Sequence, residues 1–160
     1  MIRLIGVHDV MGARMAERAR FDGVWASSLE ITTADGLLDD GLESAGHVLD
    51  VAERIAAATT LPLVADCQVE QNRPARLIAR LDSLAAHGAA AVCLQDSLFP
   101  CPNSLLPGEH PLARIEEFAA DISLARATAP AGMAVLARVQ ALVAGAGRDE
   151  ALRRAHAYAA

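Results

Sequence analysis

Five short runs of apolar residues, separated by longer segments with helical spacing, constrain the fold of this sequence more than any other feature. The runs span residues 3–8, 23–28, 61–67, 89–96 and 133–139. Each run is apolar along most of its length rather than alternating with polar residues, which is typical of strands buried on both faces of a parallel sheet. The pattern predicts an α/β protein made of strand–helix units, either an open doubly wound sheet or a (β/α)8-type barrel.

The segments between these runs have the spacing and the end signals of helices. Pro62 follows the second of them, and Gly88 stands at the end of the third. The segment after the first strand, GVHDVMG, lacks the G-x-G-x-x-G fingerprint of dinucleotide-binding sheets, so the sequence argues against that version of the fold. The helical segments are residues 12–21, 42–59, 74–88, 110–128 and 148–159.

The composition excludes several functional classes. The 160 residues contain no lysine, which excludes a Schiff-base lysine, a P-loop lysine and a lysine general base. A formal net charge of -6 and an aromatic content of 3% argue against a nucleic-acid surface, which is normally basic and stacks bases on aromatic rings. Three cysteines form no disulfide framework, and no apolar run approaches the roughly 18 residues of a membrane span. We expect a cytoplasmic protein with one domain over residues 1–160 and no nucleic-acid or membrane partner.

Polar residues lie at the end of each predicted strand. Because the carboxyl ends of parallel strands lie at one edge of a sheet, we expect these side chains to assemble a site there. The alternative is that they only mark where the strands meet solvent. The residues concerned are His8, Asp9, Ser27, Ser28, Asp66, Gln95, Asp96 and Arg138.

Two motifs resemble a known superfamily. The segment GVHDVMGARMAERARFDGVWASSLEITTADGLLDD resembles the opening of the phosphoenolpyruvate mutase/isocitrate lyase superfamily, in which an aspartate lies about fourteen residues after a tryptophan, here Asp39 and Trp25. The segment FPCPNS matches the F-P-x-x-N-S signature of the phosphoenolpyruvate mutase and phosphonopyruvate hydrolase branch. The resemblance continues to DEALRRAHAYA at the end of the chain. It implies a parallel (β/α) barrel-type fold, present here as a partial TIM barrel of about five βα units.

The resemblance implies roles for three charged residues. Asp66 matches the aspartate that directly holds Mg²⁺, and Asp39 matches an active-site aspartate close to the reacting group. Arg138 matches the arginine that steadies the transferring phosphoryl group. The chemistry is coherent, because Mg²⁺ neutralises enolate charge and a guanidinium suits a phosphoryl or carboxylate group. The implied catalytic residues are therefore Asp39 and Arg138, with Asp66 as the metal ligand.

The resemblance also implies two substrate-binding segments. Asn103 and Ser104 match a gating-loop pair that contacts the phosphoryl group. The segment after the second strand would hold the substrate carboxylate, partly through backbone N–H groups. Its residues are Trp25, Ser27, Ser28 and Leu29.

The sequence departs from the family pattern at several polar positions. Three acidic residues of the pattern are amides here, namely Gln68, Gln95 and Gln140, and two lysines are replaced by Cys101 and Ser97. A glutamine still accepts a hydrogen bond from a metal-bound water, but it lacks the negative charge that helps retain the ion. We therefore expect Mg²⁺ binding to be weak or absent.

Structural roles compete with these functional ones. Asp66 could cap the loop after its strand, and Arg138 could form an ion pair with Asp96 or Asp66. Asp39 could cap a helix, and His8 could be a buried, hydrogen-bonded imidazole. The cysteines are expected to pack in the core or lie exposed, and the remaining histidines to lie at the surface. These residues are Cys67, Cys93, Cys101, His47, His87, His110 and His156.

Five strand–helix units are fewer than the eight of a complete barrel and would leave two open sheet edges. We therefore expect a homo-oligomer or a partner chain that completes the barrel. The first functional hypothesis is a phosphoenolpyruvate mutase-like enzyme that acts on a small 2-oxo acid or phosphonate substrate, breaking or making a C–P or C–C bond with Mg²⁺ stabilising the enolate. The second is a shortened, catalytically impaired homologue that acts as a binding or assembly subunit.

Overall fold

One parallel sheet forms the centre of the molecule. The computed structural model describes residues 1–37, 45–71, 73–101 and 103–160. Within these residues, five strands pair in chain order and every pairing is parallel. The predicted α/β class with a parallel sheet is confirmed. The strands are β1 (Leu4–Val7), β2 (Gly23–Ala26), β3 (Leu63–Cys67), β4 (Ala89–Gln95) and β5 (Ala134–Arg138).

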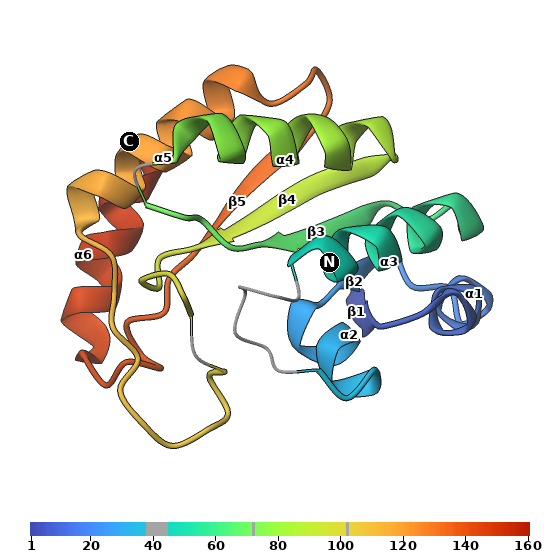
Figure 1. Cartoon of the computed structure of the whole chain (residues 1–160), viewed down its shortest axis with the longest axis horizontal. Coiled ribbons are helices and arrows are strands. Elements are labelled where there is room, and N and C mark those ends of the chain that lie inside the picture. Colours follow the sequence, from blue (N-terminus) through green and yellow to red (C-terminus); the bar gives the residue numbers. More distant parts are fainter. Residues whose placement is uncertain (38–44, 72, 102) are drawn as a thin grey trace.

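Helices form an arc around the curved sheet (Figure 1). Neighbouring helices contact one another in the order α1, α3, α4, α5 and α6, so they form a continuous outer layer. None of the helices in the described residues combines the length and the apolar character needed to cross a membrane. The helices are α1 (Val10–Arg18), α2 (Ser28–Ala34), α3 (Ala45–Ala58), α4 (Pro74–Ala86), α5 (Ile115–Thr128) and α6 (Gly147–Ala159).

The middle of the sheet is buried on both faces, which explains the continuous apolar runs. Alternate residues of a strand point to opposite faces. On β4, Val92 and Leu94 belong to the large core beneath the helices. Ala91 and Cys93 on the same strand belong to a smaller cluster on the inner face, with Trp25 of β2 packed against it.

Several elements begin or end at positions that differ from the sequence expectation, and hydrogen bonds explain two of these differences. The second strand ends at Ala26 rather than at residue 28, because Ser27 caps helix α2, its Oγ accepting a hydrogen bond from the Glu30 N–H at 3.3 Å. Helix α5 begins at Ile115, because the preceding segment pairs with the loop after β4 instead. There the Ala113 N–H donates to the Asp96 carbonyl at 2.9 Å.

Two of the three thiols should be protected from alkylation in the folded protein. Cys67 and Cys93 are buried, and burial raises the pKa of the Cys67 thiol to about 11 and that of Cys93 to about 12. Because the thiolate is the reactive form, iodoacetamide should modify both only after unfolding. Peptide mass spectrometry with and without denaturant measures this. Modification of both in native buffer would contradict the packing described here.

Candidate functional site

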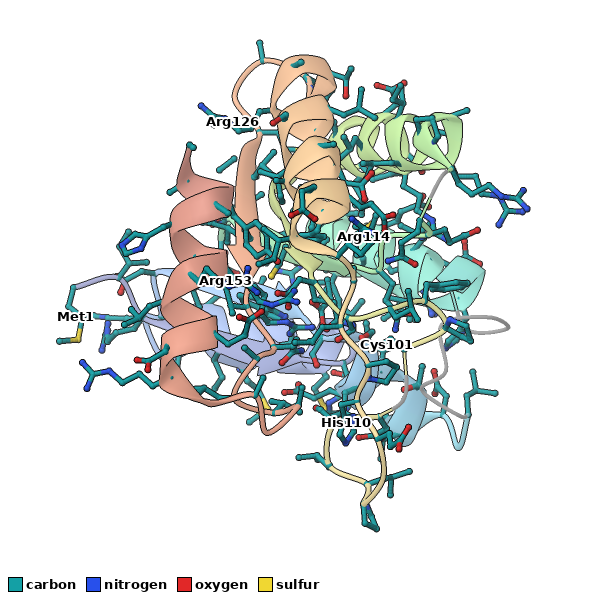
Figure 2. All side chains as sticks on the ribbon, turned by 90° about the vertical axis from the view of Figure 1, so that its left-hand side faces the viewer. Met1, Cys101, His110, Arg114, Arg126 and Arg153 are labelled. Atoms are coloured by element: carbon teal, nitrogen blue, oxygen red, sulfur yellow. The ribbon has the colours of Figure 1, made fainter. Side chains whose placement is uncertain are left out.

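A pocket of about 100 Å³ opens at the carboxyl ends of strands β2 to β5, and we call it the strand-end pocket. Parallel pairing brings these ends together from four separate stretches of the sequence. The long loop between β4 and α5 supplies further lining residues, among them Cys101 and His110, which both lie well below Arg126 in Figure 2. The described lining residues are Ser27, Ser28, Leu29, Asp66, Gln68, Gln95, Ser97, Cys101, Ser104, His110, Arg138, Gln140 and Val143.

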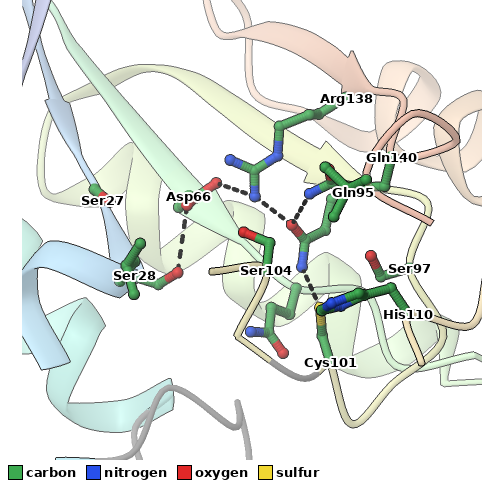
Figure 3. A pocket seen from close by; sticks show the side chains of 13 residues that line it. Ser27, Ser28, Asp66, Gln95, Ser97, Cys101, Ser104, His110, Arg138 and Gln140 are labelled. Carbon is green, nitrogen blue, oxygen red and sulfur yellow. Dashed lines mark hydrogen bonds and ion pairs between the residues drawn. The ribbon is translucent and has the colours of Figure 1, made fainter. Parts of the chain in front are cut away.

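An ion pair between Asp66 and Arg138 lies at the centre of the pocket (Figure 3). The Arg138 Nη2 atom is 3.3 Å from Asp66 Oδ1, and the Asp66 side chain is 7% exposed. The Ser28 hydroxyl donates to Asp66 Oδ2 at 3.3 Å. Burial raises the pKa of Asp66, while the Arg138 guanidinium opposes that rise. Of the two ion pairs considered for Arg138, the structure therefore contains the one with Asp66.

The side chains of Gln95, Gln140 and Arg138 form what we call the amide–guanidinium cluster (Figure 3). Arg138 Nη2 donates to Gln95 Oε1, and Gln140 Nε2 donates to the same oxygen at 3.0 Å. The Gln95 amide nitrogen in turn donates to the Cys101 sulfur at 2.9 Å. Gln95 is buried, and its Oε1 contacts the same Arg138 nitrogen, Nη2, that pairs with Asp66.

Two buried polar atoms, one in this cluster and one in another residue of the pocket wall, have no hydrogen-bond partner among the described residues. They are Arg138 Nε, a donor, and Gln68 Oε1, an acceptor. Buried donors and acceptors are normally paired, because an unpaired group costs about 1–3 kcal/mol. An unpaired guanidinium N–H in a pocket suits a ligand with an anionic oxygen.

The substrate-binding residues implied by the resemblance are distributed unevenly around the pocket. Ser27, Ser28, Leu29 and Ser104 line it. Trp25 lies on the inner face of the sheet, and a hydrogen bond from its side chain helps to lower the pKa of Asp66 against the effect of burial. Asn103 is not a lining residue, because its Oδ1 accepts a hydrogen bond from the Leu105 N–H at 2.9 Å within its own turn. Asp39 lies outside the described residues.

The histidines differ from the sequence expectation in two places. His8 is half exposed and does not line the pocket, so it is neither a buried imidazole nor part of this site. His110, expected at the surface, lines the pocket and lies 3.2 Å from the Leu106 carbonyl. Its place on the loop after FPCPNS was the one sequence signal that could have suggested this.

Asp96, next to Gln95, belongs to a separate buried network. Its Oδ2 atom accepts hydrogen bonds from Arg154 at 3.0 Å and from the Tyr158 hydroxyl at 2.9 Å, both on α6. Its Oδ1 atom accepts the Gln140 N–H at 2.7 Å. The Asp96 carboxylate thus joins the end of β4, the segment after β5 and helix α6, and it fixes the backbone on which Gln95 and Gln140 stand.

Comparison with known proteins identifies the family. The sequence matches the family described as phosphoenolpyruvate phosphomutase over residues 1–160. The chain belongs to this family. The phosphoenolpyruvate phosphomutase of Tetrahymena pyriformis is 38% identical over 160 residues, which cover 97% of this chain and 52% of that protein. The resemblance inferred from the motifs is thereby confirmed.

Solved structures agree with this assignment. The phosphoenolpyruvate phosphomutase from Streptomyces platensis subsp. rosaceus has a TM-score of 0.92 and 40% identity, covering 99% of this chain and 56% of that one. A phosphonopyruvate hydrolase in complex with oxalate and Mg²⁺ has a TM-score of 0.87 and 32% identity, covering 99% of this chain and 54% of that one. The chain therefore has the barrel-type fold of this superfamily and spans about half the length of the relatives it matches.

The donor set of the strand-end pocket does not fit the Mg²⁺ ion that one of these relatives binds. Mg²⁺ prefers six oxygen ligands, usually one or two carboxylates together with waters and substrate oxygens. Asp66 is the only carboxylate among the described lining residues, and Arg138 already pairs with it. Gln95 Oε1 already accepts two hydrogen bonds. Among the described residues, no group of three or more histidine, cysteine or acidic side chains is placed to hold a metal ion.

Replacement of Arg154 should destabilise the fold far more than replacement of its neighbour Arg153. The Arg154 side chain is 8% exposed and pairs with the fully buried Asp96, whereas Arg153 is 66% exposed and pairs with Glu150. We expect Arg154→Ala to lower the free energy of unfolding by about 3–5 kcal/mol, because it leaves Asp96 buried without its counter-ion. Arg153→Ala should cost less than about 1 kcal/mol.

Urea denaturation of both variants measures the difference. Equal effects of the two substitutions would show that the Asp96 network does not hold α6 against the sheet.

Proposed function

We propose that the strand-end pocket binds a small 2-oxo acid or its phosphonate, such as phosphonopyruvate, and that the chain supports phosphoenolpyruvate mutase-type chemistry on it. The observation on which this rests most is the unpaired Nε of Arg138 beside the Asp66 ion pair. A guanidinium whose Nη2 contacts both Asp66 and Gln95, and whose Nε has no partner among the described residues, is oriented before an anion arrives. The family relationship supplies the substrate class.

The proposed chemistry places developing charge next to Arg138. Cleavage of a C–P bond leaves electrons on the three-carbon acid as an enolate, and a fixed guanidinium stabilises such charge better than mobile water does. Ser28 and Ser104 are hydroxyl donors on the pocket wall that suit the carboxylate or phosphonate oxygens. Asp39 remains the proposed residue that stabilises or receives the reacting group.

Substitution of Arg138 should weaken anion binding. Arg138→Lys retains the charge but loses the Nε donor and the planar fork, so we expect the affinity for oxalate to fall about tenfold or more. Arg138→Ala should abolish binding. Arg18→Ala is the matched control, since Arg18 is exposed at the end of α1, at the opposite edge of the sheet.

Isothermal titration calorimetry with oxalate measures the affinities, and thermal melts verify that each variant is folded. Wild-type protein that binds neither oxalate nor phosphonopyruvate, or an Arg138→Ala variant that binds them as well as wild type, would contradict the proposed site.

The amides in the pocket favour a second candidate, a binding subunit that does not catalyse turnover. Gln68, Gln95 and Gln140 retain hydrogen bonding but carry no charge, so they suit ligand retention better than charge stabilisation during a reaction. Oxalate binding without release of phosphate or pyruvate from phosphonopyruvate would favour this candidate. Turnover of phosphonopyruvate that is lost in Arg138→Lys would favour the enzyme.

We also propose that a second copy of the chain covers the open sheet edges. Among the described strands, β1 and β5 each have a neighbour on one side only. Both edges expose apolar side chains, with Leu4 39%, Ile5 36% and Leu136 39% exposed. Since all strands are parallel, the β5 edge of one copy is complementary to the β1 edge of another.

Native mass spectrometry should therefore detect a dimer or a larger assembly of the wild-type chain. Leu136→Glu should shift the population toward monomer, because it places a charge at the contact. The matched variant Leu105→Glu changes an exposed leucine on the β4–α5 loop and should leave the assembly unchanged. A monomeric wild-type chain at micromolar concentration would contradict the assembly.

A further inference from the structure

Gln95 and Gln140 are two uncharged side chains that are hydrogen-bonded to each other in the strand-end pocket. The Gln140 amide N–H points at Gln95 Oε1 across 3.0 Å, and Arg138 donates to the same oxygen. In both of these hydrogen bonds a donor meets an acceptor, so the contact between Gln95 and Gln140 needs no added ion.

Two carboxylates at these positions would behave differently. Oxygen atoms of ionised carboxylates at this separation repel each other, so such a pair needs a shared proton or a cation between them. A side-chain amide, by contrast, brings its own N–H group, which donates a hydrogen bond to the neighbouring oxygen. The side chains of Gln95 and Gln140 therefore pack together only because both are uncharged, and the amide hydrogen occupies the place in which a cation would stabilise two acids.

The charges that remain on the described wall of the pocket are balanced. Asp66 is the only carboxylate on the described pocket wall, and the Arg138 guanidinium lies 3.3 Å from it. A divalent cation that approached Asp66 would meet the positive charge of Arg138. Among the described residues, the one unused buried side-chain acceptor it would find is the neutral Gln68 oxygen. The cation's loss of hydration would be poorly compensated.

We infer that this pocket binds its small oxyanion ligand without a divalent cation, with the amide–guanidinium cluster in the place of the metal ion. The identity of the ligand rests on the proposed function, whereas the exclusion of the cation rests on the described pocket residues alone. The chain would thus differ in its use of Mg²⁺ from the relative solved with oxalate and Mg²⁺.

The test combines cation binding with ligand binding. Electron paramagnetic resonance with Mn²⁺ as the probe measures cation binding by wild type, by the double variant Gln95→Glu/Gln140→Glu and by Asp66→Asn. A control, Ala120→Glu/Ser123→Asp, adds the same charge at exposed positions on α5. Calorimetry then measures the oxalate affinity of wild type in EDTA and in millimolar Mg²⁺.

We expect the double variant to bind Mn²⁺ at least about tenfold more tightly than wild type or the charge control. Its melting temperature should rise when Mg²⁺ is added, whereas that of wild type should not change. Wild type should bind oxalate equally in EDTA and in Mg²⁺.

Wild-type protein that binds Mn²⁺ as tightly as the double variant, and loses it in Asp66→Asn, would overturn the inference. Oxalate binding that requires Mg²⁺ would overturn it as well and leave the proposed function standing. Absence of oxalate binding in both buffers would contradict the proposed function, while the Mn²⁺ measurements still decide the inference.

Equal, weak Mn²⁺ binding by wild type and the double variant would refute the role given to the amides. Should the double variant fail to fold, wild type and Asp66→Asn alone decide whether the pocket holds a cation.

Discussion

The arrangement of the site depends on the hydrogen bonds and the ion pair that the fully buried carboxylate of Asp96 forms. This carboxylate joins three parts of the chain, because Arg154 and Tyr158 on α6 and the backbone N–H of Gln140 all donate to it. A buried carboxylate is tolerated only when its hydrogen bonds and charge are satisfied, so this packing has few alternatives. The positions of the Gln95 and Gln140 backbones are fixed by this packing.

The strand-end pocket shows a second use of buried charge. Asp66 and Arg138 neutralise each other, but the guanidinium is also held by an amide and retains an unpaired Nε. The two ion pairs thus serve different purposes. That of Asp96 fixes the scaffold, and that of Asp66 orients a cationic group whose Nε has no acceptor among the described residues.

Family membership and the residues of this pocket give different information. The match over residues 1–160 and the TM-score of 0.92 establish the common ancestry and the fold. They do not by themselves decide whether this chain binds a metal ion, because three acidic positions of the family pattern are amides here, namely Gln68, Gln95 and Gln140. Related backbones can support different chemistry when the charge of a few side chains changes.

Much of the fold followed from the sequence alone. Continuous apolar runs predicted a parallel sheet, because strands buried on both faces lack polar alternation, and the structure has strands at all five runs. The motifs around Trp25 and FPCPNS indicated the family, and the polar residues at the strand ends indicated the edge at which the pocket lies. The sequence was enough to predict these features because each of them depends on residues that are close together in the chain.

Tertiary structure decided which polar groups meet. Asp96 and Arg138 are both strand-end residues, yet Arg138 pairs with Asp66 while Asp96 pairs with Arg154, which is 58 residues later in the chain. His110 reaches the pocket, whereas His8 and the side chain of Asn103 do not line it. Spacing along the chain determines the face of a strand or helix on which a side chain lies. Its partner depends on how distant elements pack, and only the folded chain brings those elements together.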